Sequence, residues 1–249
     1  DGNLFGALEF YRQCTRAGIQ PVIGCDFFLA AESRHTRSAT DTGLRAGRLL
    51  LLAKSDAGYR NLLKLSSYGY TEGFYYRPRI DDELLERYAD DLICLTGSIN
   101  GDIPRLLLMN QLERAKSRLE LYIRIYGRDN VYLELNQHRI PEQQVLNRRL
   151  IELSREYGLE LVAANESYYV RQEDAAAHDV LLCIGGNKKR NDESRFRFTT
   201  NEFYLKDDAQ MREVFAEVPQ AVENTQRIAE QCAFEIELPG PLLPEYEIP

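Results

Sequence analysis

The chain has 249 residues, a formal net charge of −8, 44% hydrophobic residues and 28% charged residues. These values are typical of a soluble globular protein that is long enough for one large α/β domain or two small ones. The acidic balance argues against a surface that binds nucleic acid over its whole area, and no apolar run approaches the roughly 18–20 residues that span a bilayer.

The start of the chain and its cysteines indicate the compartment. The sequence opens on Asp1 without an initiator Met or a signal-peptide pattern, so we expect a piece of a longer cytoplasmic protein. Five widely spaced cysteines include no CxxC pair, which favours free thiols in a reducing environment over disulfides.

The predicted elements alternate between helices, which repeat apolar residues every three to four positions, and strands, which are short apolar runs. In chain order we predict a helix at 4–18, a strand at 21–30, a loop at 31–47, a strand at 48–55, helices at 58–70 and 81–91, a strand at 91–98, a helix at 103–127, a strand at 130–137, a helix at 141–158, a strand at 159–167 and a helix at 173–186. Strands separated by such helices predict βαβ units and a parallel sheet, buried on both faces as in a barrel or a doubly wound sheet.

The C-terminal part of the chain differs from this alternation. Residues 201–232 predict one short strand and two helices separated by Val218-Pro219. Residues 237–249 hold four of the nine prolines, which excludes a helix or a central strand. We therefore expect one domain over 1–238 and a linker over 239–249.

Functional groups of parallel α/β barrels gather where strands end, and four strand ends carry candidates. They supply Asp26; Ser98 and Asp102; Glu134 and His138; and Asn165, Glu166 and Tyr168. A hydrolytic metal site needs several good ligands at one point, and neutral Ser or Tyr hydroxyls are poor ones. Asp26, His138 and Glu166 could hold one ion weakly, but not a tight multinuclear cluster.

Other chemistry-bearing patterns are absent or weak. No P-loop, dinucleotide fingerprint or GxSxG elbow occurs. Two local basic stretches run against the acidic balance, with Arg34 and Arg37 in the first and Lys188, Lys189 and Arg190 in the second. Each is either a solvated loop or a contact for nucleic acid or an acidic partner.

Seven strings in one order resemble the PHP (polymerase and histidinol phosphatase) domain at the N-terminus of the alpha subunit of bacterial DNA polymerase III. Among them are "GNLFGALEFYRQCTRAGIQPVIGCDFFLA", "LTGSINGDIPRLLL", "YLELNQHRIPEQ" and "EDAAAHDVLLCIGG". The resemblance implies a distorted (β/α)₇ barrel whose strand ends hold metal ions in active members. It also implies that the family's first strand, with a His-x-His ligand pair, lies upstream of Asp1.

The family's metal ligands correspond only partly to this sequence. Asp1 falls at or beside a position where metal-binding members carry Asp-His, and Asp26 stands for a ligand Glu. Ser98 replaces a Cys, His138 matches the family histidine, and Glu166 and Tyr168 stand for an Asp and a His. The nitrogen and sulfur donors that select zinc-like ions are therefore mostly lost.

The resemblance leaves two hypotheses about function open. In the first, the segment is a non-catalytic structural and docking domain of a replicative polymerase whose Mg²⁺-dependent nucleotidyl transfer occurs elsewhere. Its partners would be the rest of the polymerase chain, a proofreading exonuclease subunit, other replisome subunits and DNA through the parent protein, with no membrane. In the second reading, it is a Zn²⁺- or Mn²⁺-dependent phosphoesterase or 3′–5′ exonuclease; a free-standing phosphatase of the superfamily is a weaker third.

Overall fold

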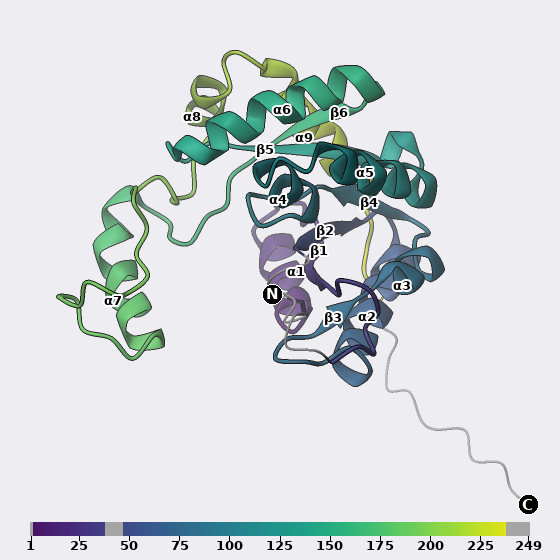
Figure 1. The fold of residues 1–249 in the computed structure, drawn as a ribbon, viewed down its shortest axis with the longest axis horizontal. Coiled ribbons are helices and arrows are strands. Elements are labelled where there is room, and N and C mark those ends of the chain that lie inside the picture. The colour runs from purple at the N-terminus through teal and green to yellow at the C-terminus, as the bar shows by residue number, and fades with distance from the viewer. Residues whose placement is uncertain (1, 38–46, 238–249) are drawn as a thin grey trace, which may run out of the picture.

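The computed structural model describes residues 2–37 and 47–237 of the chain (Figure 1). Its centre is one six-stranded sheet with the strand order β3-β1-β2-β4-β5-β6. The strands are β1 (Gly24–Leu29), β2 (Arg48–Ala53), β3 (Arg79–Ile80), β4 (Leu92–Leu95), β5 (Val131–Asn136) and β6 (Glu160–Ala164). The mixed α/β class that the sequence predicts is confirmed.

The sheet is mixed rather than wholly parallel, so the prediction of a parallel sheet was wrong for β2. This strand runs antiparallel to β1 and to β4, whereas β1–β3, β4–β5 and β5–β6 are parallel pairs. The reason is visible in the chain between β1 and β2, which carries no apolar helical period. The sequence of this connection does not predict a crossover helix, and antiparallel pairing of successive strands needs none.

Helices cover the sheet and connect its parallel strands. They are α1 (Ala7–Arg16), α2 (Asp56–Thr71), α3 (Asp82–Arg87), α4 (Asp102–Leu108), α5 (Leu112–Tyr126), α6 (Pro141–Tyr157), α7 (Ala175–Gly185), α8 (Asp208–Val214) and α9 (Pro219–Gln231), with 3₁₀ turns η1 (Arg128–Asn130) and η2 (Gln172–Asp174). Strand residues and inward helix residues form the main apolar core, with Leu49, Leu51 and Leu133 fully buried.

Several boundaries depart from the predictions. The single helix expected at 103–127 is two helices, because Asn110 adopts a left-handed φ of 57° and breaks the hydrogen-bond ladder between α4 and α5. The strand expected near residue 201 is only an isolated bridge between Tyr169 and Tyr204. The sequence reading also missed β3, which has only two residues.

The α7 arm, defined as residues 170–198, projects from the body after β6 and returns before α8 (Figure 1). Helix α7 makes its main contacts with η2 and not with the sheet. The expected linker at 239–249 lies outside the described residues, as does Asp1. Among the described residues, no helix is both long and apolar enough to cross a membrane.

Candidate functional site

The antiparallel β1–β2 pair brings Asp26 and Arg48 together. Arg48 Nη1 lies 2.5 Å from Asp26 Oδ2, and its guanidinium also lies 4.4 Å from the centre of the Phe28 ring. Burial raises the pKa of the Asp26 carboxyl, and Arg48 partly offsets that rise. Gly47 fixes the start of β2: its φ is +96°, and a Cβ there would lie 2.5 Å from Asp102 Cα.

Strand β5 carries Glu134 and Asn136 at alternate positions, which point to one side of the strand, and a third polar residue, His138, follows two positions later, beyond the end of the strand. Asn136 Nδ2 donates to Glu134 Oε1 at 2.7 Å, and both side chains are buried. Glu134 Oε2 and Asn136 Oδ1 have no hydrogen-bond partner among the described residues. Burial raises the pKa of Glu134 to about 7, against a smaller lowering by Asn136. One side-chain oxygen of each residue in this pair therefore lacks a hydrogen bond.

The third residue, His138, is fully buried and held by Gln143 from the first turn of α6. The Gln143 side-chain carbonyl accepts from the His138 backbone N–H at 2.7 Å, which leaves the amide nitrogen to donate to Nδ1 at 3.0 Å. A neutral imidazole that accepts at Nδ1 carries its proton on Nε2. Burial lowers the pKa of His138, and Lys206 lowers it further, so the neutral form is favoured.

His138 is also enclosed by an aromatic ring. Phe203 stacks on the imidazole with ring centres 4.3 Å apart and an interplanar angle of 10°. Nε2 has no hydrogen-bond partner within the described ranges 2–37 and 47–237. Phe203 therefore covers one face of the imidazole and Gln143 engages Nδ1, while Nε2 makes no well-formed hydrogen bond within those ranges, although the Glu166 backbone lies near enough to raise the pKa of the ring.

The end of β6 supplies Glu166 and Tyr168. The Tyr168 hydroxyl donates to Glu166 Oε1 at 2.6 Å, and its ring lies 5.6 Å from the Phe203 ring. Burial and the neighbouring Glu166 raise the pKa of Tyr168 above its ordinary value. A phenol that stays protonated is a hydrogen-bond donor to the carboxylate and not a metal ligand.

The predicted residues lie near one another, and each already has one atom engaged by a neighbour within the fold. Asp26 and Glu166 are close enough to Glu134 for their charges to raise its pKa further. Asp26 is paired with a guanidinium, Glu166 with a phenol, and His138 Nδ1 with an amide. No group of three or more His, Cys, Asp or Glu side chains in the described part of the chain could hold a metal ion.

Ser98, the remaining predicted position, lies in the turn after β4. Its backbone carbonyl accepts from the Gly101 N–H at 2.7 Å and so shapes the entry to α4. The nearby Thr96 hydroxyl accepts from the Glu134 backbone N–H at 3.0 Å, which ties β4 to β5 at the site.

Four residues that matter to the site were missed in the sequence: Arg48, Gln143, Phe203 and Lys206. Lys206 is almost fully buried, and its ammonium lies 3.5 Å from Glu202 Oε2. Burial lowers the pKa of Lys206. Arg48, Phe203 and Lys206 reach the site from elements distant in the sequence, whereas Gln143 is only five residues from His138 and is placed there by the first turn of α6.

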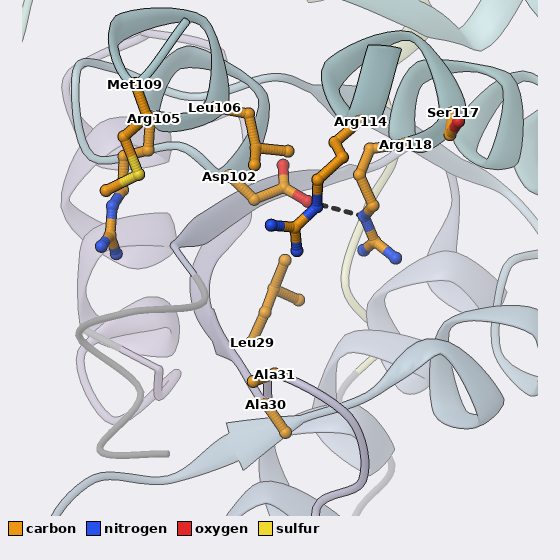
Figure 2. A pocket seen from close by; sticks show the side chains of 10 residues that line it. All are labelled: Leu29, Ala30, Ala31, Asp102, Arg105, Leu106, Met109, Arg114, Ser117 and Arg118. Carbon is orange, nitrogen blue, oxygen red and sulfur yellow. Dashed lines mark hydrogen bonds and ion pairs between the residues drawn. The ribbon is translucent and has the colours of Figure 1, made fainter. Parts of the chain in front are cut away.

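A second buried carboxylate lies apart from the candidate site, at a cavity of about 260 Å³ between α4, α5 and the end of β1 (Figure 2). Asp102 Oδ2 accepts from Arg118 Nε at 2.9 Å and from the Tyr122 hydroxyl at 2.5 Å, and Oδ1 accepts from the Ile103 N–H at 2.7 Å. Burial raises the pKa of Asp102, and these donors counteract that rise. Asp102 is thus a structural anchor of α4 and α5.

The basic residues singled out in the sequence have different environments. Arg34 is buried and pairs with Glu72, Asp81 and Glu83 at 2.6 to 3.0 Å, so it is engaged within the fold. Arg37 is exposed, as are the three residues Lys188, Lys189 and Arg190 that follow α7.

Comparison with known proteins identifies the family. Residues 1–138 match the PHP domain, which is more than half of the chain. The chain belongs to the PHP domain family. This PHP domain is 49% identical over 249 residues to DNA polymerase III subunit alpha of Borreliella burgdorferi, covering all of this chain and 22% of that protein.

Two further relatives carry the same name. DNA polymerase III subunit alpha of Treponema pallidum is 46% identical over 248 residues, covering 100% of this chain and 21% of the relative. DNA polymerase III subunit alpha of Thermus aquaticus is 43% identical over 243 residues, covering 96% of this chain and 20% of the relative. The chain therefore spans about a fifth of the length of these relatives, and the mixed α/β fold is the one expected for a PHP domain.

Proposed function

We propose that this chain is the PHP domain of a bacterial replicative DNA polymerase, and that the domain itself is structural and non-catalytic. Identity of 43–49% over nearly the whole chain to three proteins named DNA polymerase III subunit alpha supports the first part. On this proposal the parent protein performs template-directed nucleotidyl transfer in the cytoplasm. Its Mg²⁺ and catalytic carboxylates belong to another part of the chain.

The observation that carries the second part is the ion pair between Asp26 and Arg48. In a metal-binding member a cation compensates the carboxylate at this strand end, and here a guanidinium within 2.5 Å does so. A guanidinium is always charged and donates directionally, so it neutralises Asp26 without an ion. In the same way, the Tyr168 hydroxyl donates a hydrogen bond to the Glu166 carboxylate.

The domain's role would then be to brace the polymerase module and offer docking surfaces to replisome subunits, including a proofreading exonuclease. The domain boundary of 1–238 and the linker at 239–249 belong to this proposal. The exposed residues Arg37, Lys188, Lys189 and Arg190 are its candidate contacts with nucleic acid or an acidic partner. Arg34 is left out because it is buried among carboxylates.

One observation favours the alternative, a metal-dependent phosphoesterase or 3′–5′ exonuclease. Glu134 Oε2, Asn136 Oδ1 and His138 Nε2 are buried and unpartnered among the described residues, and buried polar atoms ordinarily have partners. On this alternative Asp26, His138 and Glu166 would be the residual ligands. We favour the structural proposal because two of these three residues are already occupied by charged or phenolic donors.

Elemental analysis of the purified full-length protein separates the two functions. After dialysis against buffer without metal, we expect less than one Zn²⁺ or Mn²⁺ per chain attributable to this domain, measured as the difference between the wild type and Asp26→Ala with His138→Ala. Two or more ions per chain that this pair of substitutions removes would contradict the structural proposal. So would a 3′-end nuclease activity that His138→Ala abolishes while DNA synthesis persists.

A further inference from the structure

Helix α7 is amphipathic in the opposite sense from an ordinary surface helix. Apart from Gly185, the exposed residues of α7 are Ala176, Ala177, Val180, Leu181 and Ile184. Ala176 lines the hollow beside His178 and Asp179, so we call the other four residues, which recur at the spacing of one helical face, the outer face of α7. Leu181 is 63% exposed and Ile184 is 71% exposed. The outer face contains no polar or charged side chain.

The polar residues of α7 point instead toward the rest of the arm and toward Tyr168, which precedes it. Asp179 accepts from Arg195 Nη1 at 2.6 Å and from Nη2 at 2.8 Å, and the Arg195 side chain is only 6% exposed. His178 packs among rings, with centres 5.5 Å from Tyr168 and 5.6 Å from Phe198. These contacts fix the orientation of the helix, so the outer face cannot turn inward without breaking them.

A surface helix normally places its apolar stripe on the core and its charges in water. The outer face of α7 does the reverse, and the arm holds it away from the sheet (Figure 1). A contiguous apolar patch on a projecting element marks a surface that another structure covers.

We propose that the outer face of α7 packs against the polymerase portion of the same polypeptide, an inference that rests on the proposed function. The relatives in Borreliella and Treponema extend well beyond the match, which covers only 22% and 21% of their lengths. A module tethered in the same chain is present at an effective concentration that reaches about the millimolar range, so it outcompetes a second copy of the protein.

The chemistry of the covering surface can also be stated. Lys188 and Lys189 are exposed just beyond the C-terminal end of α7, whereas Arg190 Nε lies 3.8 Å from Asp179 Oδ2, on the side of the helix that faces the arm. The complementary surface therefore has an apolar centre for Leu181 and Ile184 and acidic side chains where it meets Lys188 and Lys189. This combination of apolar centre and charged rim is the usual composition of an interface between domains.

Thiol labelling of the full-length protein tests whether the face is covered. Ile184→Cys places a thiol on the outer face, and Val145→Cys places one on α6, where the side chain is 46% exposed. Each rate is read from its own peptide by mass spectrometry and is divided by the rate in the unfolded protein. We expect position 184 to be modified at least about tenfold more slowly than position 145, because modification then waits for local opening. Equal rates would overturn the proposal.

A photocrosslinking residue at Leu181 identifies what covers the face. We expect cross-links within one polypeptide, to peptides outside residues 1–249. Cross-links between two copies, or protection that disappears on dilution, would assign the face to self-association and overturn the proposal. Cross-links to a separate subunit alone would do the same.

The results distinguish a failure of this packing proposal from a failure of the proposed function. A full-length protein that synthesises DNA while position 184 labels as fast as position 145 refutes only the packing of α7. A protein that does not synthesise DNA under any condition refutes the proposed function, whatever the labelling at position 184.

Discussion

Two buried carboxylate sites in this domain differ in how completely they are satisfied. At the cavity between α4 and α5, Asp102 accepts from a guanidinium, a phenol and a backbone N–H. Along β5 and just beyond it, Glu134 Oε2, Asn136 Oδ1 and His138 Nε2 have no partner among the described residues. Buried polar groups are ordinarily paired, so the first site contributes to stability through its completed pairs, while the second carries polar atoms that the fold does not satisfy.

The largest effect should come from Asp102. Replacing it by Ala leaves Arg118 and Tyr122 without their shared acceptor in a buried position. We expect the free energy of unfolding to fall by about 3–5 kcal/mol, the range for breaking a buried pair on one side. Denaturant unfolding measures this change.

Met109→Ala, at the same cavity but 55% exposed, is the matched control and should change the free energy of unfolding little. If Asp102→Ala were no more destabilising than that control, the cavity carboxylate would not be an anchor, and the contrast between the two sites would disappear.

Glu134 should produce the next largest effect, and one that depends on pH. Its pKa in the folded state, about 7, lies above the ordinary value of 4.5, so the folded state binds the proton more tightly than the unfolded state does. Stability should therefore fall as the pH rises from about 4.5 to 7 and change little beyond, by an amount of order 1–3 kcal/mol.

Glu134→Gln is neutral at every pH and keeps the shape of the side chain, so its stability should lack this fall. The measurement is the free energy of unfolding of both proteins at several pH values. If the free energy of unfolding changed with pH in the same way for the wild type and for Glu134→Gln, Glu134 would have an ordinary pKa in the folded state. Its carboxylate would then have hydrogen-bond partners that the geometry does not indicate.

The ion pair of Asp26 and Arg48 should have a smaller effect, because both side chains are about a quarter to a third exposed. Arg48→Met alone should destabilise the domain by about 1–2 kcal/mol, between the ranges for exposed and buried pairs. Asp26→Asn combined with Arg48→Met should recover part of that loss, since no uncompensated carboxylate then remains. A double-mutant cycle with no coupling would remove Arg48 from its assigned role.

The smallest effect belongs to Tyr168→Phe. It removes the 2.6 Å hydrogen bond to Glu166 but keeps the ring contact with Phe203. Because Tyr168 is 47% exposed, water can replace the lost donor, and we expect a change of about 0.5–1 kcal/mol in thermal or denaturant unfolding. A loss as large as that of Asp102→Ala would place Tyr168 among the anchors of the fold.

The sequence by itself determined the order of the main helices and strands, because apolar periodicity is a local property that survives folding. It also determined which donor types stand at the strand ends, so Asp26, His138, Glu166 and Tyr168 could be named in advance. In the structure the charges of Asp26 and Glu166 act on Glu134, Glu166 accepts from Tyr168 and its charge acts on His138, while the role of these residues as a site stays a prediction.

Only the tertiary structure decided the direction of β2, the pairing of Arg48 with Asp26 and the clamp of Gln143 on His138. It also decided that Arg34 is buried and that the outer face of α7 is apolar toward solvent. Apart from the contact of Gln143 with His138, which is five residues away, each of these depends on contacts between elements that are separate in the chain. Local periodicity fixes which residues share a face, but only packing decides what that face meets.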